Sequence, residues 1–159
     1  MPDPQRTPAG EAMTPLILEL FRLNSLIQTT GDRLVAGLGL TSARWQILAA
    51  VDAAERPQPV AWLARDIGGN RQNVQRIVND LHRDGLVTFE SNPHHRRAQL
   101  VVMTDKGGKA LGAAMDLQIP WVNHVTEGLS VKDIEVVRRV VARLRERIEQ
   151  AQDADQAEE

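Results

Sequence analysis

Residues 60–103 hold the pattern that most narrows the folds open to this chain. Apolar residues recur at helical spacing in two short segments, 60–67 and 71–84, separated by Gly68-Gly69-Asn70. Glycine is typical of a helix end, and asparagine is typical of the cap that starts the next helix. Two short helices joined by such a tight turn predict a helix-turn-helix.

The period of the apolar pattern changes directly after Gly85. Residues 86–90 and 98–103 are β-rich runs, and the polar segment 91–97 separates them. This arrangement predicts a β-hairpin with a long, basic tip. A hairpin that directly follows a helix-turn-helix is the wing of a winged helix.

Longer helices are predicted on both sides of this lobe. Thr14-Pro15 provide a cap and a first helical position for a helix that reaches residue 37, and a capping-box-like start predicts another helix over 130–148. Two more helices are expected between them, after Thr41 and after Thr104. The predicted fold class is therefore mainly α, an α+β winged helix-turn-helix with about six helices and a two- to three-stranded wing.

The domain organisation follows from these elements. Residues 1–13 are rich in proline and polar residues, so they are expected to form a mobile N-terminal arm. Residues 39–104 form the winged helix-turn-helix lobe. Residues 14–38 and 105–149 hold helices with wide apolar stripes, which predict a helical dimerisation region, although a long helix can also cover only its own core. The acidic residues 150–159 form a tail.

Composition excludes several functional classes. The 159-residue chain has no cysteine, which rules out disulfides, thiolate zinc sites and thiol-based sensing. It has neither an apolar leader nor a run of about eighteen apolar residues, so we expect no membrane association and a cytoplasmic location. No nucleophile–base pair, carboxylate cluster or phosphate-binding glycine loop is recognisable, so we expect neither an enzyme nor a cofactor.

The local charge favours a nucleic-acid partner although the net charge of the chain is −2. Between Leu63 and Arg97 there are six arginines and four acidic residues.

Within the helix 71–84, the positions opposite the apolar face carry arginine, glutamine and asparagine. Arginine suits guanine N7 and O6, and the amides suit adenine N6 and N7. A solvated helix face carries the same residue types, but the turn before this helix and the hairpin after it favour DNA recognition. The predicted base-contacting residues are Arg71, Gln72, Asn73, Gln75 and Arg76.

The wing tip is the second predicted DNA contact. His94, His95, Arg96 and Arg97 lie together in a segment that has no acidic residue between Glu90 and Asp105. Arginines on such a loop can enter a minor groove or pair with phosphates. The alternative is that the charged tip only makes the hairpin soluble. The adjacent histidines lack the Cys, Asp or Glu needed to complete a metal site, so phosphate contact or pH-tuned DNA affinity is favoured over metal binding.

Six segments carry the most specific residues of this pattern: Gly39–Leu48, Val60–Arg65, Arg71–Leu81, Asp84–Val87, Asn92–Ala98 and Leu100–Gly107. Together with the order of the parts, they resemble the MarR family of bacterial transcriptional regulators over about residues 15–149. The family's wing usually carries Asp-x-Arg, with the acid orienting the arginine. Here His95 and Arg97 stand at those places, so the acid is missing.

The resemblance implies a function as well as a fold. It implies an intertwined homodimer that binds double-stranded DNA in the bacterial nucleoid. The dimer would place its two recognition helices about one DNA turn apart on a pseudo-palindromic operator. It also implies repression that a small aromatic or phenolic effector relieves by favouring a conformation that mismatches the DNA. The residues predicted to line the effector pocket, which can equally be ordinary packing residues, are Asn24, Gln28, Arg44, Trp45 and Met115.

Two other functions remain open from the residues alone. A winged helix can serve protein contact or architectural DNA binding without an effector, and it would then prefer no particular DNA sequence. A small helical enzyme would require a perturbed acid–base pair in a cleft, and the sequence offers no candidate pair.

Overall fold

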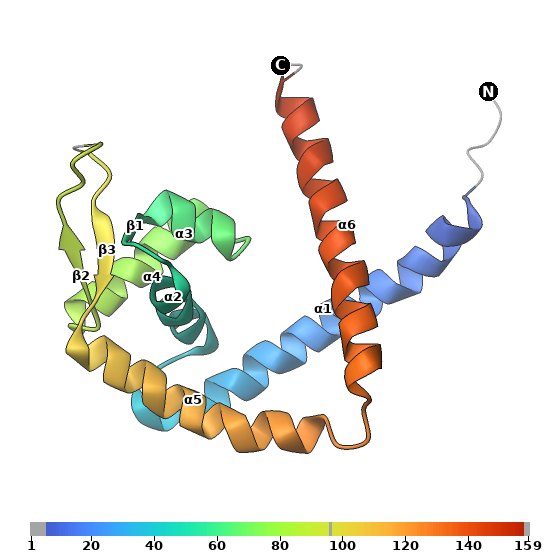
Figure 1. Cartoon of the computed structure of the whole chain (residues 1–159), viewed down its shortest axis with the longest axis horizontal. Helices are drawn as coiled ribbons and strands as arrows, with labels where there is room; N and C mark the ends of the chain where they lie inside the picture. Colours follow the sequence, from blue (N-terminus) through green and yellow to red (C-terminus); the bar gives the residue numbers. More distant parts are fainter. Residues whose placement is uncertain (1–5, 96, 158–159) are drawn as a thin grey trace. The chain divides into compact units, whose positions relative to one another are not determined.

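The computed structural model describes residues 6–95 and 97–157 (Figure 1). The chain divides into two compact units between Ile119 and Pro120. The first unit comprises most of the helices and the sheet, and the second contains the end of α5 and all of α6. The elements are α1 (Pro8–Val35), the 3-10 helix η1 (Ala36–Leu38), α2 (Ser42–Ala53), β1 (Gln58–Pro59), α3 (Val60–Asp66), α4 (Arg71–Arg83), β2 (Val87–Glu90), β3 (Leu100–Met103), α5 (Asp105–Val125) and α6 (Val131–Ala157).

The sheet is small, antiparallel and ordered β1-β3-β2. Val101 of β3 lies opposite Phe89 of β2 on one side and opposite Gln58 of β1 on the other. The predicted hairpin is confirmed as β2 and β3, and the two-residue β1 completes a three-stranded wing. Because β1 leads directly into α3, its pairing with β3 ties the wing to the helix-turn-helix.

The core of the first unit is built from aliphatic residues, as the scarcity of aromatic residues in the sequence requires. The largest fully buried side chains come from α1, α2, α3, α4 and the sheet, and α5 adds two smaller contributions. Burial of this apolar surface is the main force that fixes the positions of the short helices. The core residues are Val35, Leu40, Ile47, Leu48, Val60, Leu63, Ala64, Val74, Ile77, Val78, Leu81, Leu86, Val87, Val101, Leu111 and Ala114.

The predicted start of the first helix at Thr14 is wrong. The helix begins at Pro8, where the Thr7 side chain accepts a hydrogen bond from the backbone N–H of Gly10, and Pro15 lies inside it. The same Thr-Pro start signal therefore occurs twice, and the first copy caps the helix. Residues 8–13, assigned to a mobile arm from the sequence, belong to α1.

The last helix is also longer than predicted. The prediction ended it near residue 148, but α6 extends to Ala157 and so includes most of the acidic tail. Alanine, glutamine and glutamate are good helix formers, and no glycine or proline stops the helix there.

No single helix in the described part of the chain is long and apolar enough to cross a membrane. The pair of segments Pro8–Leu38 and Ser42–Ala53 reaches the required length and hydropathy only together, with a bend of 81° between them.

Candidate nucleic-acid interface

The helix α4 is fixed at its start by a side-chain cap and along its length by burial. The Oδ1 atom of Asn70 accepts hydrogen bonds from the backbone N–H groups of Gln72 (2.9 Å) and Asn73 (3.2 Å). These N–H groups have no partner within the helix, so the cap stabilises its first turn. The side chains that anchor α4 in the core are Val74, Ile77, Val78 and Leu81.

The face of α4 opposite this core is polar and open to solvent. Arg71, Gln72, Asn73 and Arg76 are exposed, and Gln75 is half-buried. The structure therefore gathers all five residues predicted for base contact along the first half of one helix. Whether they contact DNA stays a prediction.

Hydrogen bonds along α4 hold two of these side chains in place. Arg76 donates to Asn73 Oδ1 (3.0 Å) and lies 3.5 Å from an Asp80 carboxylate oxygen, and Gln75 donates to Asn79 Oδ1 (3.0 Å). Asn79 is an exposed amide that is absent from the residues predicted for base contact. It lies four residues after Gln75, the spacing at which side chains on one helix face meet.

The C-terminal end of α4 is held by contacts from distant parts of the chain. Arg44 of α2 forms an ion pair with Asp84 (2.5 Å) and donates to the carbonyl oxygen of Gly39 (3.1 Å). Lys106 donates to the carbonyl oxygen of Asp84 (2.7 Å). The Arg44 side chain is only 19% exposed, which strengthens this ion pair relative to one at the open surface. Both ends of α4 are thus restrained.

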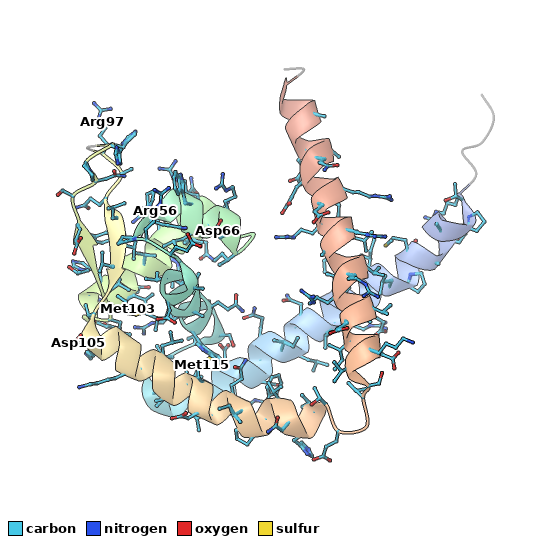
Figure 2. The ribbon with its side chains drawn as sticks, in the orientation of Figure 1. Arg56, Asp66, Arg97, Met103, Asp105 and Met115 are labelled. Atoms are coloured by element: carbon cyan, nitrogen blue, oxygen red, sulfur yellow. The ribbon has the colours of Figure 1, made fainter. Side chains whose placement is uncertain are left out.

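Two hydrogen bonds are formed by the described residues of the wing tip. The Asn92 Oδ1 atom accepts from the backbone N–H of His94 (3.0 Å), and the His95 carbonyl oxygen accepts from the N–H of Ala98 (3.0 Å). His94, His95 and Arg97 are exposed, and Arg97 lies at the tip (Figure 2). Arg96, the fourth predicted wing residue, lies outside the described residues.

The wing and α4 meet at one small cavity. This cavity of about 100 Å³ is lined by Arg71 and Gln75 of α4 and by Arg97 of the wing, with Phe89 from β2. Sequence alone placed these residues in two separate motifs. The fold brings basic side chains from both motifs to a single surface, which is the arrangement needed to contact a polyanion.

The five residues predicted for an effector pocket lie in three helices of the first unit. Asn24 and Met115 are exposed, Gln28 is half-buried, and Trp45 packs against the core. The backbone carbonyl oxygen of Gln28 accepts from Ser42 Oγ (2.7 Å), and Arg44 is engaged with Asp84. None of these five residues lines the cavity beside the wing. The effector pocket therefore stays a prediction.

A helix with a buried anchoring face and a polar outer face, placed after a tight turn and before a basic hairpin, defines a winged helix-turn-helix lobe. The model of the MarR family matches residues 38–98, which cover the helix-turn-helix and the wing as far as Ala98. An uncharacterised protein of Mycobacterium tuberculosis is 33% identical over 135 residues, which cover 85% of this chain and 93% of that protein. The chain belongs to the MarR family of winged helix-turn-helix transcription regulators.

Solved structures with a similar fold include DNA complexes. The M. tuberculosis transcriptional regulator MosR in complex with DNA is 27% identical, with a TM-score of 0.73 over 85% of this chain and 96% of that chain. The transcriptional repressor CouR bound to a 23-mer DNA duplex is 24% identical, with a TM-score of 0.73 over 88% of this chain and 99% of that chain. CouR from Rhodococcus jostii RHA1 bound to p-coumaroyl-CoA is 17% identical, with a TM-score of 0.72 over 81% and 90% of the two chains.

Proposed function

We propose that this regulator is a homodimeric repressor that binds a pseudo-palindromic operator and releases it when a small aromatic or phenolic molecule binds. The observation that carries the DNA-binding part is the convergence of Arg71, Gln75 and Arg97 on one cavity beside the exposed face of α4. In this proposal α4 reads base edges in the major groove, and the wing contacts phosphates or a minor groove.

The apolar surface of the long helices supports a dimer. On α1, Phe21 is 69% exposed and Leu26 is 65% exposed, and on α6, Val131 is 73% exposed. Contiguous exposed apolar residues on a helix mark a surface that a partner covers. A second copy that covers these stripes would place two α4 helices on the two halves of an inverted repeat.

Release by an effector is proposed by analogy with the repressor CouR, which binds p-coumaroyl-CoA. We place the effector near the five residues predicted above, Asn24, Gln28, Arg44, Trp45 and Met115. Arg44 supports this placement, because its ion pair with Asp84 links α2 to the end of the proposed recognition helix. A ligand that displaced Arg44 would loosen that helix and lower the affinity for the operator.

Selection of bound duplexes from a random DNA pool tests the proposal. At about 0.15 M salt, where nonspecific contacts are weakened, we expect enrichment of an inverted repeat whose half-site centres lie about one helical turn apart. The enriched duplex then becomes the probe for effector screening and for a promoter fusion that separates repression from activation. Absence of any enriched sequence would favour a protein-contact or architectural module instead.

The variant Arg97→Ala separates the role of the wing from that of α4. We expect operator binding to weaken roughly three- to tenfold, and the slope of log affinity against log salt to become shallower by about one for each phosphate that Arg97 would have neutralised. The preferred sequence should not change, because phosphate contacts carry no base information. Fluorescence anisotropy across a salt series measures both quantities. A changed sequence preference with an unchanged salt slope would contradict this role.

A further inference from the structure

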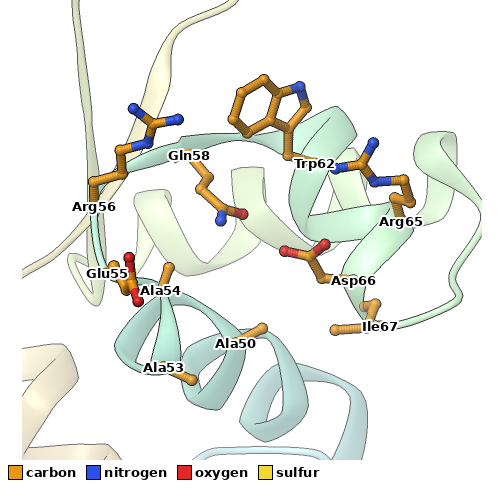
Figure 3. Close-up of a pocket in the computed structure, with 10 residues that line it drawn as sticks. All are labelled: Ala50, Ala53, Ala54, Glu55, Arg56, Gln58, Trp62, Arg65, Asp66 and Ile67. Carbon is orange, nitrogen blue, oxygen red and sulfur yellow. The ribbon is translucent and has the colours of Figure 1, made fainter.

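A second, larger cavity is lined by residues of α2, β1 and α3 and the segments that join them, and by none of the predicted DNA-contacting residues. It has a volume of about 540 Å³, which is within the range of small-molecule sites. Its floor is formed by small apolar residues at the end of α2, Ala50, Ala53 and Ala54, and Ile67 closes one side. Figure 3 shows these residues together with the polar side chains of the rim.

One polar oxygen of this cavity is buried and lacks a donor. The Oε1 atom of Gln58 is shielded from solvent and has no hydrogen-bond partner among the described residues. The amide of Gln58 and the carboxylate of Asp66 point into the same space (Figure 3). Asp66 and Glu55 also form no ion pair within the described part of the chain. A buried acceptor without a partner costs free energy, so a ligand that donates to it gains affinity.

The positive side chains of the cavity are already engaged at its rim. The guanidinium carbons of Arg56 and Arg65 lie 5.8 Å and 6.0 Å from the centroid of the Trp62 ring. Figure 3 shows them on either side of the indole. At these distances the ring attracts both cations. The side of the cavity toward Gln58 and Asp66 therefore presents acceptors, the unpaired Gln58 Oε1 atom and an exposed carboxylate.

We propose that this cavity binds a small organic cation with several N–H donors, such as an amidinium or guanidinium group on a ring-sized apolar body. The N–H groups would donate to Gln58 Oε1 and to the Asp66 carboxylate, and charge assistance strengthens the second contact. The apolar body would lie over the alanine floor beside Ile67. This site is separate from the effector pocket proposed above and takes a ligand of different charge, so it does not depend on that proposal.

Benzamidinium and benzoate form a matched pair of probes, because they share ring and shape but differ in charge and in hydrogen-bond donors. Titration calorimetry on the full chain should show saturable binding of benzamidinium, at least about tenfold tighter than benzoate. Asp66→Asn and Gln58→Met should each weaken benzamidinium binding roughly tenfold. Glu90→Gln, which removes an exposed acid that does not line the cavity, should leave it unchanged.

The thermal midpoint of each variant, measured without ligand, shows whether the variant is folded. Equal or tighter binding of benzoate would mean that the arginines dominate the site, and it would overturn the proposal. Absence of saturable benzamidinium binding by folded protein would overturn it too, and so would equal weakening by Glu90→Gln. None of these results bears on operator binding, which is measured separately.

Discussion

Replacing Gly107 with alanine is expected to lower the free energy of unfolding by about 3 kcal/mol or more, because overpacking against rigid backbone is among the costliest single changes. A Cβ atom at Gly107 would overlap the backbone carbonyl oxygen of Leu86 and would lie 2.7 Å from Met103 Sδ. The carbonyl cannot retreat freely, since it accepts hydrogen bonds from Thr104 N (3.2 Å) and Thr104 Oγ1 (3.0 Å). The start of α5 would have to move away from β2.

The neighbouring glycine provides the control. A Cβ atom at Gly108 meets no heavy atom within 4 Å, and the residue is exposed in the same helix. Gly108→Ala should therefore leave stability unchanged or raise it by up to about 1 kcal/mol, because alanine favours helix. Urea unfolding monitored by circular dichroism compares the two variants. Equal midpoints for Gly107→Ala and Gly108→Ala would show that α5 does not approach β2 this closely.

The winged helix could be predicted from the sequence because its signals are local. Gly68-Gly69-Asn70 ends one helix and caps the next, and the apolar positions of 71–84 leave one polar face. The change from helical to alternating spacing after Gly85 locates the hairpin. Each of these signals depends on residues a few positions apart, and the structure confirms the elements that they predict.

The contacts that hold the site together could not be predicted in this way. Arg44 and Asp84 are 40 residues apart, and Lys106 reaches the same turn from 22 residues away. No periodicity links such positions, because they meet only through the packing of α2, α4 and α5. The two-residue strand β1 is hidden for the same reason, since it exists only by pairing with β3. The predicted start of α1 was wrong for a different reason. Two identical Thr-Pro pairs can each begin a helix, and the sequence does not show which one does.

The triple variant Arg71→Ala, Gln72→Ala, Arg76→Ala is expected to abolish the preference for operator over random DNA. A good bidentate contact to a base contributes about 1–3 kcal/mol of discrimination, so removal of several in each half-site should lower the specific affinity at least about a hundredfold. The three side chains are exposed, and the anchoring residues of α4 remain in place, so the fold should persist. Anisotropy titrations with operator and with scrambled duplex measure the ratio of the two affinities.

Arg83→Ala is the matched control for charge on the same helix. Arg83 is 73% exposed in the last turn of α4, beyond the predicted base-contacting residues, and its side chain pairs with Asp80 (2.7 Å). Its removal should change operator affinity by less than about threefold, because the pair is at the surface and the arginine is too far along the helix to reach base edges. If the triple variant kept its operator preference while folded, or if Arg83→Ala abolished it equally, the proposed recognition surface on the first half of α4 would be wrong.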